Sequence, residues 1–117
     1  MPDQTVNVTF DPAANPQFVF EPDEVTMTAK GKVIFLRRGA SPTWTFTDGT
    51  VKNDTLKQFS SSVQGQGRSL HIDDDFRDKQ KTSYEYTVSV QLDGTSFTSP
   101  DPVIVNDPGS CARRRRG

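Results

Sequence analysis

Apolar and polar residues alternate along most of this chain, with the period of two that is typical of a β-strand. The alternation is clearest over residues 83–92, where one face carries Tyr84, Tyr86, Val88, Val90 and Leu92. Shorter alternating stretches cover residues 5–10, 25–29, 43–47 and 70–72, and residues 18–20 and 103–105 are expected to be further short strands. No stretch repeats apolar residues at three and four positions, so the pattern predicts an all-β protein.

One stretch departs from the alternation. Residues 33–36 (Val-Ile-Phe-Leu) form the longest continuous apolar run, which predicts a strand at the centre of a sheet with both faces covered. Residues 53–69 are polar and rich in Ser, Gln and Gly, and we expect Phe59 and Val63 to be their inward anchors.

Two Asp-Gly pairs predict tight hairpins. The first pair, at residues 48–49, would join residues 43–47 to the residues that follow it. The second, at residues 93–94, would set Val90 opposite Phe97 and keep Phe97 on the apolar face. Asp-Pro pairs at 101–102 and 107–108 bracket the last strand, where a proline inside the strand would remove a hydrogen-bond donor.

About eight short strands with turn signals every 8–12 residues predict a single antiparallel β-sandwich. We assign this sandwich domain to residues 1–108, because a chain of 117 residues fits one domain. Residues 109–117 are expected to be a disordered basic tail that contains Arg113, Arg114, Arg115 and Arg116.

Residues 20–35 resemble the opening of a cupredoxin-type sandwich, in which an F-x-P turn precedes a strand, a glycine turn and a second strand. The resemblance implies a cupredoxin-like or immunoglobulin-like Greek-key fold. It also implies a copper-binding His where this chain has Trp44, and Cys, His and Met ligands between Tyr84 and Val105, where none is present. The alternation of Trp44 with Phe46 instead favours a core position for the indole over a stacking platform.

A second resemblance rests on the dipeptides Glu21-Pro22 and Asp101-Pro102, the latter followed by Val103-Ile104. These residues resemble the DP-EP family of short bacterial proteins over about residues 5–107. The resemblance implies a bacterial protein and carries no particular activity.

Composition narrows the classes of partner. No apolar stretch reaches the roughly 20 residues of a membrane span, and the first residues lack the features of a signal peptide, so we expect a cytoplasmic protein.

The single cysteine, Cys111, excludes an intrachain disulfide. Without Arg113–Arg116, 10 of the 14 basic residues remain against 15 acidic ones, and an acidic body is a poor partner for nucleic acid.

Candidate chemistry gathers around the only histidine. His71 lies close in sequence to Asp73, Asp74 and Asp75, which predicts either a metal-dependent or hydrolytic site or a solvated acidic loop. One histidine and one distant cysteine are too few for a copper or zinc site, so no cofactor is expected. No Gly-x-Ser-x-Gly motif accompanies the serines at 60–62.

The hypothesis that remains is a non-enzymatic protein-binding module. Exposed strand edges can pair with another protein or with a second copy, and residues 53–69 and 71–81 are the expected recognition surfaces. The alternative for Arg113–Arg116 is polyanion binding, against the interpretation of a solvated tail.

Overall fold

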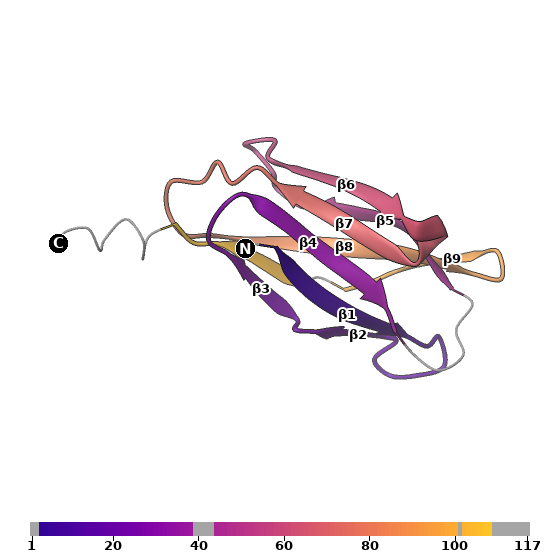
Figure 1. Cartoon of the computed structure of the whole chain (residues 1–117). Coiled ribbons are helices and arrows are strands. Elements are labelled where there is room, and N and C mark those ends of the chain that lie inside the picture. The colour runs from indigo at the N-terminus through magenta and orange to yellow at the C-terminus, as the bar shows by residue number, and fades with distance from the viewer. Residues whose placement is uncertain (1–2, 39–43, 101, 109–117) are drawn as a thin grey trace.

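Two β-sheets packed face to face make up the structure (Figure 1). The computed structural model describes residues 3–38, 44–100 and 102–108; the expected tail at 109–117, with Arg113–Arg116, lies outside these residues. Sheet A has the strand order β2-β1-β4-β7-β6, and sheet B has the order β3-β10-β8-β5, with β9 paired to β8. The strands are β1 (Gln4–Phe10), β2 (Phe18–Glu21), β3 (Glu24–Met27), β4 (Gly31–Arg37), β5 (Thr45–Val51), β6 (Phe59–Gln64), β7 (Ser69–Asp74), β8 (Thr82–Leu92), β9 (Thr95–Thr98) and β10 (Val103–Asn106).

The predicted all-β sandwich is confirmed, but the expectation of purely antiparallel sheets was wrong, because both sheets are mixed. Strand β1 runs parallel to β4, and β3 runs parallel to β10, while the other neighbouring strands are antiparallel. The 3-10 turn η1 (Gly65–Gly67) joins β6 to β7. No helix in the described ranges has the length and apolar character that a membrane crossing requires.

The core lies between the sheets and is built by the alternating residues. Its largest fully buried side chains include Trp44, Tyr86, Phe35, Phe46 and Met27. Trp44 is 1% exposed and packs edge-on against Phe46, which confirms its core position. Such aromatic pairs add to the hydrophobic free energy of burial.

Strand β4 lies at the centre of sheet A, as the apolar run predicted. The expectation that both of its faces are covered was wrong. Val33 and Phe35 are fully buried, whereas Ile34 and Leu36 are only half-buried on the outer face. A sandwich of two sheets buries the inner face of each sheet and leaves the outer face beside solvent.

The first predicted hairpin was also wrong. Residues 48–49 lie inside β5 and pair with Ser89 and Val88 of β8, and the ladder shifts register between Phe46 and Asp48. Gly49 is buried against Leu70 of the opposite sheet, so this glycine serves close packing between sheets and not a turn.

The second predicted hairpin is confirmed. Strands β8 and β9 meet at Asp93 and Gly94, both with positive φ, and Val90 pairs with Phe97. Beyond β9, β10 pairs with an earlier stretch of β8, and Ser99 lies in the gap between them. The backbone N–H of Val88 donates to Ser99 Oγ at 2.9 Å, so a side chain replaces a ladder acceptor there.

The polar segment 53–69 contains strand β6 and the turn η1. Phe59 is half-buried and packs against the core, as expected. Val63 pairs with the inward-facing Leu70 and so lies on the inner face of β6, but it is 38% exposed and does not anchor the segment in the core. The physical reason is the position of β6 at the edge of sheet A, where its side chains have a neighbouring strand of the same sheet on one side only.

Candidate functional site

The residues predicted around His71 do not form one cluster. His71 and Asp73 lie on the outer face of β7, Asp74 points into the protein, and Asp75 follows the end of the strand. Strand alternation separates neighbouring residues in this way. A site that needs all four side chains together is therefore not built here.

The outer face of β7 does bring a serine beside the histidine. Ser62 of β6 pairs with His71, and Ser60 pairs with Asp73. The Ser62 hydroxyl accepts a hydrogen bond from Gln64 Nε2 at 2.9 Å, and no hydrogen bond joins His71 to a serine or an aspartate in the described part of the chain. The bonded nucleophile and base that hydrolysis requires are not assembled in this arrangement.

The exposed carboxylate of Asp75 pairs with two cations. Its oxygens lie 3.6 Å from Lys30 Nζ and 3.1 Å from an Arg77 guanidinium nitrogen. Within residues 3–38, 44–100 and 102–108, no group of three or more His, Cys, Asp or Glu side chains is arranged to hold a metal ion. The Asp75 end of the acidic segment thus joins ion pairs at the surface.

A buried polar cluster, which the sequence analysis missed, lies at the end of the sandwich where β7 and β10 stop. Its central residue is Gln58, 3% exposed. The Gln58 amide nitrogen donates to Asp78 and to the Tyr84 hydroxyl, and its oxygen accepts from the Arg77 backbone N–H at 2.7 Å. Asn106, fully buried on β10, donates to Asp78 at 3.0 Å.

Asp74, at the end of β7, is the most deeply buried carboxylate of this cluster, at 1% exposed. Its Oδ1 accepts hydrogen bonds from the Phe76 backbone N–H at 2.8 Å and from Asn106 Nδ2 at 3.2 Å. Burial raises the pKa of this carboxyl from its ordinary 3.8 to about 6, and the negative charges of Asp78 and Asp54 act in the same direction. The two hydrogen bonds act against the rise but do not cancel it.

Strand β6 presents a second candidate site, the free edge of sheet A. The Asp75 backbone N–H donates to the Gln58 carbonyl at 2.9 Å. This bond shows which residues of β6 direct their backbone groups toward β7. Bonded residues alternate along an antiparallel pair, so Ser60 and every second residue after it bond to β7. The N–H and C=O groups of Ser61 and Val63 therefore point away from β7, to the outer edge.

Strand β6 lies beside β5, the edge strand of the opposite sheet. Gly49 of β5 packs against Leu70 and Ile72 of β7. A pocket lies between the two edges, lined by Gly49, Thr50, Val51, Asp54, Phe59, Ser60, Ser61 and Ile72. Ser61 and Val63, on the inner face of β6, consequently stay exposed.

Other edge strands in the described residues are shorter or blunted. Strands β2, β3 and β9 have four residues each. Strand β5 has seven residues but carries Asp48 and the register shift beside it. Strand β6 has six residues, with no charge and no proline. Proteins usually protect an edge of this length with a charge, a proline or a bulge, and β6 has none of these.

Comparison with known proteins gives a family and no function. The family model described as the DP-EP family matches residues 2–108, which spans both sheets. A search of curated proteins gives no match.

Proposed function

We propose that this chain, which belongs to the DP-EP family, is a non-enzymatic interaction module that binds an extended segment of another protein as an added strand beside β6. The supporting observation is the unprotected edge at Ser61 and Val63. In strand addition, main-chain hydrogen bonds supply affinity, and the alternate side chains of the guest strand supply specificity.

The surroundings of β6 define the chemistry of the guest strand. On the inner face, Val63 is 38% exposed and Phe59 is half-buried, so apolar guest side chains at alternate positions would cover them. On the outer face, Ser60 pairs with the exposed Asp73, which favours a polar or basic guest residue at that end. The expected guest is therefore an extended segment with apolar residues on one face and polar or basic residues on the other.

Charge favours a different protein over a second copy of this chain. Up to residue 112 the sequence has 10 basic and 15 acidic residues, so two copies that meet at their bodies repel each other. A neutral or basic guest meets no such repulsion. Pairing between two copies is the competing outcome of the experiment below.

A displayed library of seven-residue peptides, selected for binding to the wild-type chain, tests the proposal. Binders are then measured against Val63→Lys, which places a charge on the inner face of the edge, and Ser61→Pro, which removes an outward N–H without removing a bond to β7. We expect both substitutions to weaken the selected peptides at least tenfold.

The matched control is Gln64→Lys, which adds the same charge at the neighbouring exposed position on the outer face. This variant should bind the peptides like the wild type, and thermal unfolding should show that all three variants are folded. The proposal is overturned if no peptide distinguishes Val63→Lys from Gln64→Lys. It is equally overturned if sedimentation shows that the edge is occupied by a second copy.

A further inference from the structure

Two buried oxygens in the polar cluster have no hydrogen-bond donor within the described residues: Oδ2 of Asp74 and Oδ1 of Asn106. Asp74 is 1% exposed and Asn106 is fully buried. Buried polar atoms in folded proteins almost always have a partner, so two orphan acceptors on residues already in contact point to a missing donor.

The orientation of the Asn106 amide is fixed by its neighbours. Its Nδ2 lies 3.3 Å from a Gln58 oxygen, 3.2 Å from Asp74 Oδ1 and 3.0 Å from Asp78 Oδ2. A rotated amide would set Oδ1 against three acceptors, which is unfavourable. The amide is therefore oriented with Nδ2 toward these three oxygens, and its Oδ1 is left without a donor from the residues that the structure describes.

An acid and an amide joined by one hydrogen bond can form a second, from the acid hydroxyl to the amide oxygen. We propose that Asp74 is a proton-binding site, in which a proton on Asp74 Oδ2 is donated to Asn106 Oδ1 and fastens β7 of one sheet to β10 of the other. One proton thus removes both orphan acceptors. It adds to the bond that Asn106 Nδ2 already donates to Asp74 Oδ1.

The charged neighbours favour this proton. Asp78 and Asp54 raise the pKa of Asp74, although less than burial does. The Asp78 carboxylate accepts bonds from Gln58, Tyr84 and Asn106, so its own oxygens are already satisfied. The remaining charged groups around the pocket beside Asp74 are Asp3, Lys30, Lys32, Asp73 and Asp75. Of these, Lys30 is engaged with Asp75 at 3.6 Å.

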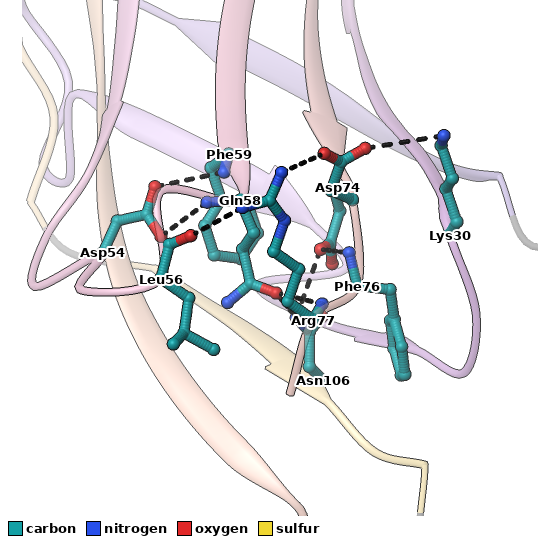
Figure 2. Close-up of polar contacts among 10 residues, drawn as sticks. Lys30, Asp54, Leu56, Gln58, Phe59, Asp74, Phe76, Arg77 and Asn106 are labelled. Carbon is teal, nitrogen blue, oxygen red and sulfur yellow. Dashed lines mark hydrogen bonds and ion pairs between the residues drawn. The ribbon is translucent and has the colours of Figure 1, made fainter. Parts of the chain in front are cut away.

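The proton state controls the segment that follows β7. Asp74 Oδ1 accepts from the Phe76 N–H and Gln58 accepts from the Arg77 N–H, so the start of loop 75–81 is tied to the cluster (Figure 2). When Asp74 loses its proton, a buried carboxylate with an orphan oxygen is left beside Asp78. Local opening of loop 75–81 lets water reach that oxygen. This pH-dependent joint does not depend on the proposed binding at β6.

The experiment compares the wild type with Asp74→Asn, whose amide supplies the missing donor permanently, and with Asp75→Asn, a surface control that loses only exposed ion pairs. Because folded Asp74 binds its proton more tightly than the unfolded chain does, wild-type stability falls as pH rises from about 4 to above 6. Relative to Asp74→Asn, the wild-type unfolding equilibrium constant should increase on the order of a hundredfold between pH 4 and pH 8.

Two further measurements make the test decisive. Carboxyl carbon NMR should give Asp74 a titration midpoint near 6. Amide exchange at Phe76 and Arg77, corrected for intrinsic rates, should accelerate above that midpoint in the wild type and in Asp75→Asn, and not in Asp74→Asn. A titration midpoint of Asp74 near 3.8 overturns the proposal. The same pH dependence of amide exchange in Asp74→Asn as in the wild type also overturns it. If Asp74→Asn does not fold, the titration of Asp74 in the wild type decides alone.

Discussion

Gly49 of β5 lies so close to Leu70 of β7 that a Cβ atom at position 49 would stand 2.8 Å from Leu70 Cδ2. Ile72 Cδ1 is the next neighbour, at 3.5 Å. Both neighbours are fully buried, so neither side chain can move into solvent. The absence of a side chain at this position therefore sets how closely the two sheets approach each other where β5 crosses β7.

Substitution Gly49→Val should destabilise the protein by about 1–3 kcal/mol, because it overpacks the contact with Leu70. Equilibrium urea unfolding measures the loss. The control is Thr50→Ala at the exposed neighbouring position, where a change within about 0.5 kcal/mol is expected. Equal stability of Gly49→Val and the wild type would mean that the sheets separate here without cost.

The same glycine shows where sequence patterning works and where it fails. Asp93-Gly94 and Asp48-Gly49 are indistinguishable as local turn signals, yet only the former forms a hairpin. Alternation over residues 83–92 fixed the face of every side chain in β8, because a slip by one residue would turn the whole apolar face to water. Contacts between sheets overrode the turn signal at Gly49, and such contacts carry no local pattern.

The candidate sites were foreseen only in part. The segments 53–69 and 71–81 were expected to be recognition surfaces, and β6 and the acidic loop lie within them. The buried cluster was missed, because Gln58 and Asn106 are far from Asp74 in sequence and have the character of ordinary surface residues, while Asp74 was grouped with Asp73 and Asp75. A weak signal existed in alternation: Asp74 continues the inward face of Leu70 and Ile72.

A second prediction concerns the break between β9 and β10. Substitution Ser99→Ala removes the acceptor of the Val88 N–H and leaves that buried donor unpaired, so we expect a loss of about 1–3 kcal/mol in unfolding free energy. Ser99→Thr keeps the hydroxyl and should recover most of this loss. Ser89→Ala removes only an exposed contact to Thr98 and should change stability by less than about 0.5 kcal/mol. A stable Ser99→Ala variant would contradict the assigned bond.

A third prediction concerns alkaline pH. The chain has two tyrosines, Tyr84 and Tyr86, and burial raises the pKa of both, that of Tyr84 to about 12 and that of Tyr86 further. The folded state thus keeps two protons that the unfolded chain releases near pH 10, so stability falls as pH rises above 10. Phenolate absorbance at 295 nm should stay low at pH 11 and appear together with unfolding. Normal titration near pH 10 in the folded protein would contradict the burial of these rings.

The two tyrosine hydroxyls should differ in their effect on stability, although both lie on the same face of β8. The Tyr84 hydroxyl donates to Asp78 at 2.8 Å and accepts from Gln58 at 2.9 Å, so Tyr84→Phe should cost about 1–3 kcal/mol by leaving buried partners unsatisfied. The Tyr86 hydroxyl is buried without a partner among the described residues, so Tyr86→Phe should be neutral or about 1 kcal/mol more stable. Urea unfolding at pH 7 measures the free energy of unfolding of both variants. Because the two substitutions remove the same hydroxyl from the same kind of ring, the difference between them reports the hydrogen bonds of Tyr84. A similar loss in both would mean that Tyr86 makes a hydrogen bond after all, and the interior between the sheets would then need a bound water beside it.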